Sequence, residues 1–304
     1  MRAIVYDRYG PPEVLRLAQL DAPHPRADQV RVRVYIAGVN PVDAKQRRGD
    51  FAGPDLKRDD FPKRLGNEYA GVIDAVGSDV SALAVGDEVL GSTVAQAYSE
   101  LIVVDAADVV LKPTTLSWEA AGALPAAGQT AVTALQTIRV GADDTVIIHG
   151  AAGGVGTVAI QLACLAGTTV IGTASEANHD YLRHLGAIPV TYGAGLVERV
   201  AQIAPRGIDA ALDLVGGEAI AASLELVPDR GRIATTVDRD AAATHGLHRA
   251  GARSTEALRA VVRLASAGDV VLTVDATLGL AEAVHAHRRI EAGHATGKTA
   301  LRVA

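Results

Sequence analysis

The spacing of apolar residues along the chain changes near residue 118. Before this point the apolar residues come in short runs, such as residues 3–5 and 109–111, and residues 30–36 alternate apolar with polar side chains as a half-buried strand does. Between Gly66 and Gly91, short Val, Ile and Ala runs are broken by Gly and Asp. This spacing is typical of a compact barrel of antiparallel strands, so residues 1–118 are predicted to be β-rich.

From residue 117 to about residue 251, helical and strand patterns alternate, as they do in a doubly wound α/β domain. Ser117 is a candidate N-cap for a helix through Ala121, and a second helix is predicted from Gly128 to just before Gly141. Residues 238–254 show little periodicity. The other predicted strands are 189–192, 208–215, 231–237 and 270–274, and the other predicted helices are 181–185, 196–203, 255–267 and 281–291.

One βαβ unit runs from Thr145 to Ser175. A short apolar run is followed by a turn of small residues, a helix with apolar positions at helical spacing, and the start of a second strand. In the G-x-G-x-x-G frame Ala151 holds the first place, and Gly153 and Gly156 hold the other two. Because these residues lack bulky side chains, backbone N–H groups can approach a pyrophosphate, which the helix dipole also favours. The turn is therefore predicted to bind a dinucleotide through Gly150, Ala151, Ala152, Gly153, Gly154, Val155 and Gly156.

Two other interpretations of this turn exist. A tight strand-to-helix turn without a ligand is the structural alternative. A phosphate-binding NTPase loop is excluded, because no Lys-Ser or Lys-Thr pair follows the glycines.

The composition narrows the classes of function. With 304 residues the chain can form two domains, and its net charge of −6 does not favour a nucleic acid or an anionic membrane as partner. The single cysteine, Cys164, excludes an internal disulfide and a multi-cysteine zinc site. The N-terminal residues lack a signal-peptide pattern, and no apolar run reaches 18 residues, so a cytoplasmic protein is expected.

Several motifs together resemble the medium-chain dehydrogenase/reductase superfamily, and most closely its zinc-independent quinone oxidoreductase branch, the zeta-crystallin-like proteins. The motifs span nearly the whole chain: Gly38-Val39-Asn40-Pro41-Val42-Asp43, residues 65–72, residues 85–89, Gly128-Gln129-Thr130-Ala131, residues 149–156, and Gly293-His294 with Gly297-Lys298.

The resemblance implies an α/β fold, in which a Rossmann doubly wound parallel sheet is joined to a GroES-like β-barrel domain. The barrel would comprise residues 1–118, completed by about 255–304, and the NADP(H)-binding domain would comprise residues 119–254. The active site of the family lies in the cleft between the two domains. Family members commonly form homodimers through the edge of the Rossmann sheet, which would place residues 231–237 near the two-fold axis.

The sequence departs from the metal-dependent relatives at the zinc site. Those relatives carry a zinc ligand at the His of a Gly-His-Glu motif, whereas this chain has Gly66-Asn67-Glu68. The remaining histidines are scattered, and the pairs His245/His248 and His285/His287 are interpreted as ordinary exposed histidines. We therefore expect no metal.

The end of the second strand of the βαβ unit bears on the choice of cofactor. NAD-specific folds place an acidic residue there, but this chain has Ala174 and then Ser175, which can donate to a phosphate. Tyr192 resembles a tyrosine that relatives use beside the same group, and Thr173 ends the strand. NADP(H) is therefore predicted over NAD. NAD stays open as the alternative, because Glu176 follows Ser175 directly and could point back toward the ribose. The next basic residue is only Arg183, so Asn178 and His179 would have to bind the 2′-phosphate in place of a basic side chain.

Hydride transfer depends on positioning and a dry site, because the cofactor carries the difficult step. By resemblance, Asn40 and Asp43 border the nicotinamide and substrate, Lys45 stabilises developing charge, Thr130 faces the nicotinamide edge and Lys298 reaches the cofactor. A structural ion pair between Asp43 and Arg47 is the alternative for that loop, and a surface lysine is the alternative for Lys298.

The sequence thus predicts an NADPH-dependent, metal-free reductase of quinones or α,β-unsaturated carbonyls. The other class considered is a nucleotide-binding structural or regulatory protein of the same fold with little or no turnover.

Overall fold

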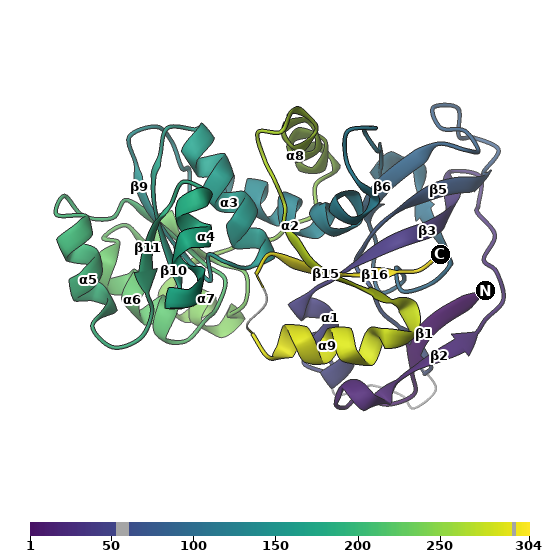
Figure 1. Cartoon of the computed structure of the whole chain (residues 1–304), viewed down its shortest axis with the longest axis horizontal. Helices are drawn as coiled ribbons and strands as arrows, with labels where there is room; N and C mark the ends of the chain where they lie inside the picture. The colour runs from purple at the N-terminus through teal and green to yellow at the C-terminus, as the bar shows by residue number, and fades with distance from the viewer. Residues whose placement is uncertain (53–60, 294–295) are drawn as a thin grey trace. The chain divides into compact units, whose positions relative to one another are not determined.

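A computed structural model describes residues 1–52, 61–293 and 296–304, which divide into two compact units. Unit 1 comprises Met1–Ala126 and Thr273–Ala304, and unit 2 comprises Ala127–Leu272. Both chain termini therefore belong to unit 1 (Figure 1).

Unit 1 is built around one long strand, β3 (Gln29–Val39), which pairs antiparallel with β5, β7 and β16. Its seven-stranded sheet has the order β15-β16-β3-β5-β6-β8, with β7 also on β3, and a smaller sheet has the order β2-β1-β4. The other strands are β1 (Arg2–Tyr6), β2 (Leu15–Gln19), β4 (Lys63–Arg64), β5 (Glu68–Val76), β6 (Glu88–Ser92), β7 (Leu101–Asp105), β8 (Val109–Leu111), β15 (Val274–Gly279) and β16 (Lys298–Arg302). The helices are α1 (Pro41–Arg48) and α9 (Ala283–Glu291), with 3-10 turns η1 (Pro12–Val14), η3 (Ala106–Asp108) and η6 (Leu280–Glu282).

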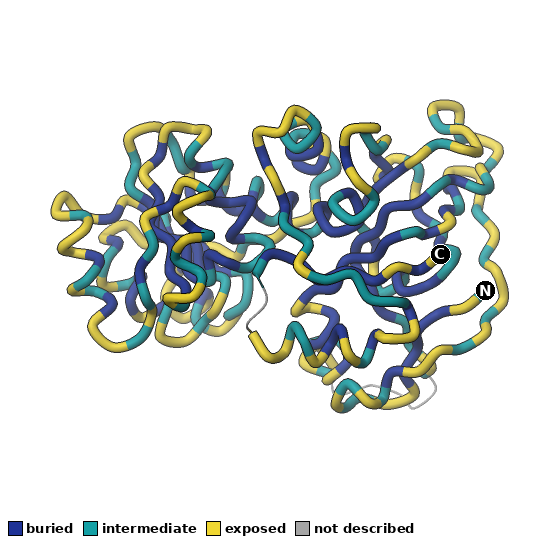
Figure 2. The backbone as a smooth tube through the Cα atoms, viewed as in Figure 1, coloured by how far each residue is buried: buried dark blue, intermediate teal, exposed yellow. Residues whose placement is uncertain are grey.

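The burial of β3 explains the alternation seen in its sequence. Val30, Val32 and Val34 are fully buried in the core of unit 1, while Arg33 between them is exposed. From Ile36 to the end of the strand every residue is buried. Figure 2 shows long stretches of buried backbone in the strands of unit 1. The strand therefore delivers its last residues, and Asn40 at the N-cap of α1, into the interior of unit 1.

Unit 2 is a parallel sheet of the order β11-β10-β9-β12-β13-β14, which is the strand order of a Rossmann fold. Helices pack on both faces of this sheet. On one face Ile147 and Ile171 belong to a hydrophobic core that includes helix residues. On the opposite face Gly172 lies so close to Leu182 of α4 that an added Cβ would be 2.7 Å from the leucine side chain. Its strands are β9 (Thr145–His149), β10 (Thr169–Ala174), β11 (Ile188–Thr191), β12 (Ala210–Asp213), β13 (Ile233–Thr235) and β14 (His248–Arg249). Its helices are α3 (Gly154–Leu165), α4 (His179–His184), α5 (Leu196–Ile203), α6 (Glu218–Leu226), α7 (Arg239–His245) and α8 (Thr255–Ala267), with 3-10 turns η4 (Glu176–Asn178) and η5 (Arg230–Arg232).

One helix replaces the two that were predicted between residues 117 and 141. Helix α2 (Trp118–Thr137) is continuous and contains Pro125. Ser117 caps its start, since its Oγ accepts from the Ala120 N–H at 3.1 Å. The prediction of a break at Gly128 was wrong because most residues from 121 to 131 are buried, and such packing outweighs the low helix propensity of glycine.

The predictions for residues 238–279 also needed correction. Residues 238–254 form α7 and the edge strand β14, and the cap signals at Asp238 and Gly246 were present in the sequence. The strand predicted at residues 270–274 is β15, which begins only at Val274, because β15 pairs with β16 from that residue onwards. Helix α8 belongs to unit 2, and its cap residue Ser254 donates its N–H to Gln129 on α2 at 2.8 Å. The chain therefore returns to unit 1 at Thr273, later than the predicted residue 255.

No helix in the described part of the chain has both the length and the apolar surface that crossing a lipid bilayer requires.

Candidate functional site

Three strands of unit 1 bring a buried ion pair together. Asn40 follows the end of β3, Glu68 begins β5 and Lys298 begins β16, and β3 lies between the other two strands. Lys298 Nζ donates to Glu68 Oε1 and to Asn40 Oδ1, both at 2.5 Å, and lies 3.4 Å from Val39 O. Glu68 is fully buried and Lys298 is 5% exposed. Two charges can remain in such an interior because they pair with each other and their other lone pairs and protons are bonded.

Asn40 lies at the centre of this group. Its Nδ2 donates to Glu68 Oε1 at 2.8 Å, while its Oδ1 accepts from Lys298. An ammonium group can only donate, so the amide oxygen must face Lys298 and the amide nitrogen must face Glu68. One N–H of the amide has no partner among the described residues.

Asp43 is completely buried and holds the start of α1. Its carboxylate accepts from the Asn40 N–H at 2.8 Å, from Asn67 Nδ2 at 2.5 Å and from Tyr98 OH at 2.9 Å. Burial raises the pKa of Asp43 to about 6, against the opposing effect of these three donors and of Lys298. The pKa of Tyr98 is raised well above its usual value, by burial first and then by Asp43.

The residues at this position do not fit a zinc ion. Asn67 replaces the expected histidine, and its Nδ2 donates to Asp43 and, at 3.1 Å, to Gln46 Oε1. The ammonium of Lys298 already lies among the oxygens of Glu68 and Asn40. Within the described ranges no group of three or more His, Cys, Asp or Glu side chains could hold a metal ion.

Arg47 pairs with α9 rather than with Asp43, so the alternative ion pair considered for this loop is not formed. The Arg47 guanidinium is buried and donates to Glu291 Oε1 at 2.5 Å and to Gly10 O at 3.0 Å. It also lies 3.1 Å from His287 Nδ1, which must accept because a guanidinium has no acceptor. Burial, and then the charge of Arg47, lowers the pKa of His287 to about 4.

Two predicted catalytic residues lie outside this network. Lys45, on α1, is half-buried and lines a hollow of about 200 Å³ together with Arg48 and Glu291. Thr130, on α2, belongs to unit 2, where a Cβ at Gly251 would lie 3.7 Å from its Cγ2. The structure thus brings Asn40, Asp43 and Lys298 together, and the roles of Lys45 and Thr130 stay predictions.

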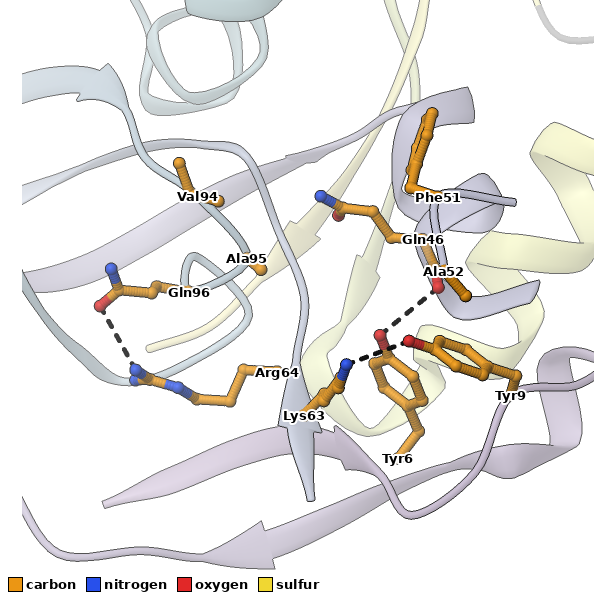
Figure 3. A pocket seen from close by; sticks show the side chains of 10 residues that line it. All are labelled: Tyr6, Tyr9, Gln46, Phe51, Ala52, Lys63, Arg64, Val94, Ala95 and Gln96. Atoms are coloured by element: carbon orange, nitrogen blue, oxygen red, sulfur yellow. Dashed lines mark hydrogen bonds between the residues drawn. The ribbon is translucent and has the colours of Figure 1, made fainter. Parts of the chain in front are cut away.

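Unit 1 also contains a larger pocket of about 460 Å³ (Figure 3). Lys63 Nζ donates to Tyr9 OH at 3.0 Å and lies 5.1 Å from the ring centre of Phe61. Gln46, on α1, connects this pocket with Asn67. Residues 53–60, which follow Phe51 and Ala52 of this pocket in the chain, lie outside the described residues. The pocket is lined by Tyr6, Tyr9, Gln46, Phe51, Ala52, Lys63, Arg64, Val94, Ala95 and Gln96.

The small-residue turn in unit 2 joins β9 to α3. The left-handed position is Gly150, with φ +70°, so the tight turn is made one residue before Ala151. Gly153 is the N-cap of α3, and the first N–H groups of the helix, from Gly154 onwards, have no partner within the helix. A Cβ at Gly156 would lie 2.5 Å from Ala151 O, so only glycine allows the helix to approach the turn this closely. The turn has the form of an anion site at the carboxyl end of a parallel strand.

A row of polar residues crosses the sheet beside this turn. Thr173, His149, Asp213 and Thr235 are in register on β10, β9, β12 and β13, at the carboxyl ends of the strands, where Rossmann folds bind their ligands. Thr173 Oγ1 lies 3.3 Å from His149 Nδ1, and Asp213 Oδ2 accepts from Thr235 Oγ1 at 2.6 Å. Burial lowers the pKa of His149 to about 4, which keeps it neutral. Of these four residues, only Thr173 was predicted as a site residue from the sequence. The other three could have been found because each is a polar residue that ends, or closely follows, a buried apolar run.

The residues predicted to read the cofactor lie at neighbouring strand ends. Ala174 pairs with Thr191, so Ser175 and Tyr192 are the next residues along the two strands. Ser175 is half-buried and accepts from Asn178 at 3.4 Å, and Tyr192 is 61% exposed. Glu176 is exposed. Arg199, which the sequence analysis did not consider, holds this loop through the carbonyl oxygens of Thr191, Tyr192, Gly193 and Ala194.

We predict that replacing His287 by Gln reduces the pH dependence of stability in mild acid. A histidine whose pKa falls from 6.5 to about 4 on folding binds a proton more readily in the unfolded chain. The free energy of unfolding therefore keeps its full value above pH 6.5 and falls as the pH drops below it. At pH 4 the loss that His287 causes is about 3 kcal/mol. Gln keeps an acceptor for Arg47 and cannot be protonated, so the variant should lack this loss.

Urea unfolding between pH 4 and 7.5 measures the difference. The control is His285→Gln on the same helix, because His285 is exposed and should leave the slope unchanged. The raised pKa of Asp43 makes the folded protein more stable as the pH falls, which opposes the effect of His287. Asp43 is present in all three proteins, so it does not affect the comparison. Equal slopes for the wild type and His287→Gln would contradict the prediction.

Comparison with known proteins places this geometry in a family. Residues 26–114 match the alcohol dehydrogenase GroES-like domain, and residues 185–301 match the zinc-binding dehydrogenase domain. The quinone oxidoreductase of Pseudomonas aeruginosa is 30% identical over 99% of both chains. The 2-methylene-furan-3-one reductase of Solanum lycopersicum is 31% identical, over 99% of this chain and 79% of the relative. The structure of Escherichia coli quinone oxidoreductase complexed with NADPH matches with a TM-score of 0.87 and 26% identity, covering 99% of this chain and 100% of that one.

These similarities run over both units, so the GroES-like and Rossmann architecture is shared as a whole. The chain is an oxidoreductase that belongs to the quinone oxidoreductase family of the medium-chain dehydrogenases/reductases.

Proposed function

We propose that this oxidoreductase uses NADPH, without a metal, to transfer hydride to a quinone or an α,β-unsaturated carbonyl. The observation that carries the proposal is the turn at residues 150–156, whose free N–H groups lie at the carboxyl edge of a parallel sheet. The Escherichia coli neighbour was solved with NADPH, and the relatives include a quinone oxidoreductase and a reductase of an enone, which supports both the cofactor and the acceptor class.

NADPH supplies the hydride, and the protein binds and orients the reactants. The N–H groups of Gly154, Val155 and Gly156 bind the pyrophosphate, and Ser175 with Tyr192 bind the 2′-phosphate. No acidic residue stands at position 174 to repel that phosphate.

In unit 1, Asn40 donates its remaining amide N–H to the acceptor oxygen. Quinones and enones both gain negative charge on that oxygen when hydride arrives at carbon, so a fixed donor stabilises the transition state. The pocket in Figure 3 supplies aromatic side chains and donors for a flat conjugated ring, and its residue Gln46 borders the Asn67 and Asp43 group.

The wild-type protein should oxidise NADPH in the presence of a benzoquinone or a simple enone, with a lower KM for NADPH than for NADH. Absorbance at the nicotinamide band, measured with both cofactors and both acceptor classes, gives the comparison. Preference for NADH would refute the cofactor assignment. Binding of NADPH without turnover of any acceptor would refute the enzyme and support a structural or regulatory nucleotide-binding protein.

Two glycine variants separate folding from cofactor binding at the turn. At Gly153 the nearest atom to an added Cβ is 3.4 Å away, so Gly153→Ala should change the free energy of unfolding by about 0.5 kcal/mol or less. Its methyl group would face the pyrophosphate, so the Kd for NADPH should rise about tenfold or more. Gly156→Ala should instead cost about 2 kcal/mol of stability, because the clash with Ala151 O outweighs the helix propensity gained.

Thermal unfolding and NADPH fluorescence titration measure the two effects. If Gly153→Ala binds NADPH as the wild type does, the turn is not the pyrophosphate site. Gly156→Ala serves as the matched control for general disruption of the turn.

We also propose that the protein is a homodimer paired through the edge of the sheet of unit 2. In the structure this edge is β14, which covers the predicted strand β13. Light scattering on a size-exclusion column should give about twice the chain mass of 31.3 kDa, and a monomer mass would refute the proposal.

A further inference from the structure

Glu68 accepts hydrogen bonds from three different segments of unit 1. Its Oε1 accepts from Asn40 Nδ2 and from Lys298 Nζ, and its Oε2 accepts from the Ala126 N–H at 2.7 Å. Gly38 on the neighbouring strand makes room for it, since a Cβ there would lie 2.1 Å from Oε1. Glu68 is completely buried, so a carboxylate at this position must be held by its partners.

We propose that Glu68 is the positioning residue of the site: it fixes the Asn40 amide and anchors both segments through which the chain passes between the units. The catalytic part rests on the proposed function, whereas the anchoring part does not.

The first consequence concerns the direction of the Asn40 amide. Glu68 accepts from the amide nitrogen and Lys298 donates to the amide oxygen, so the group cannot flip. A cation on the oxygen draws electron density from the nitrogen, which makes the remaining N–H a stronger donor. The pair therefore acts on the reaction through Asn40 without touching the reacting atoms.

The second consequence concerns the two chain crossings. The chain leaves unit 1 after Ala126, whose N–H follows Pro125 in α2 and donates to Glu68. It returns at Thr273, whose carbonyl oxygen accepts from the Lys298 N–H at 2.9 Å. The Glu68 carboxylate therefore holds the last residue before the first crossing directly. The backbone of its partner Lys298 holds the first residue after the second crossing.

The competing explanation is that Glu68 only stabilises the fold. Variants that change either the charge of the carboxylate or its place, but not both, distinguish this explanation from the positioning role. Glu68→Gln keeps the size of the side chain but places an NH₂ against one of its three donors. Gly38→Ala displaces the carboxylate without changing its charge. The double variant Glu68→Gln/Lys298→Met removes both buried charges, so it should recover stability that either single variant loses.

The control is Asp74→Asn, on the same strand β5. Asp74 pairs with Arg31 at 2.8 Å across the sheet, and both side chains are largely buried. It has no contact with Asn40, Lys298 or Ala126 among the described residues. Its loss should reduce stability without changing kcat.

We expect kcat for acceptor reduction to fall tenfold or more in Glu68→Gln and Gly38→Ala, with the Kd for NADPH within about twofold of the wild type. The double variant should regain stability but keep the low kcat. Recovery of kcat together with stability would overturn the proposal, because a purely structural ion pair behaves in that way.

Hydrogen–deuterium exchange tests the anchoring without turnover. Peptides that cover Ala126 and Lys298 should exchange faster in Glu68→Gln than in the wild type, and Asp74→Asn should leave both unchanged. Unchanged exchange in Glu68→Gln would overturn the anchoring, even in a protein that proved inactive. Absence of NADPH oxidation by the wild type, in contrast, would refute the proposed function.

Discussion

The interior of unit 1 is organised by the need to satisfy a buried ammonium group. Lys298 is 5% exposed, and an unpaired charge at that depth would destabilise the fold strongly. Glu68 and Asn40 meet this need from two other strands, and Asp43 is linked to Asn40 through the backbone at the start of α1. The positions of the strand ends and of the first turn of α1 thus depend on one ion pair.

In unit 2 the groups available to a ligand are backbone N–H groups, whereas in unit 1 they are side chains. Glycine at 150, 153 and 156 lets the chain turn sharply and brings α3 against the end of β9. In the row of Thr173, His149, Asp213 and Thr235, two side-chain contacts lie within the sheet, between Thr173 and His149 and between Asp213 and Thr235. The first N–H groups of the helix are the ones that the proposed function assigns to the pyrophosphate, and His149, at the end of β9 just before the turn, is kept neutral by its burial.

The charged groups around Asn67 also differ from what a zinc site needs. Asn67 donates to Asp43 and Gln46, and a lysine ammonium lies among the oxygens of Glu68 and Asn40. A cation is thus built into the chain itself. It can polarise the Asn40 amide, which the proposed function uses as the donor to the acceptor oxygen.

The sequence by itself determined the elements whose pattern is local. The alternation of β3, the βαβ unit with its small-residue turn and the change of class near residue 118 follow from side-chain periodicity and glycine placement. The motif at residues 38–43 singled out Asn40 and Asp43, which the structure joins by a hydrogen bond, while their predicted place beside the nicotinamide stays a prediction. These features depend on residues a few positions apart, which a pattern can record.

Only the tertiary structure decided which distant residues meet. Glu68 and Lys298 are 230 positions apart, and Arg47 reaches Glu291 over 244, so no spacing in the sequence relates them. The continuity of α2 through Gly128 and the place of β14 likewise depend on packing, which overrode weak local signals. The sequence determined which side chains could carry the chemistry, and the fold determined their partners, because buried charges choose partners by proximity in space.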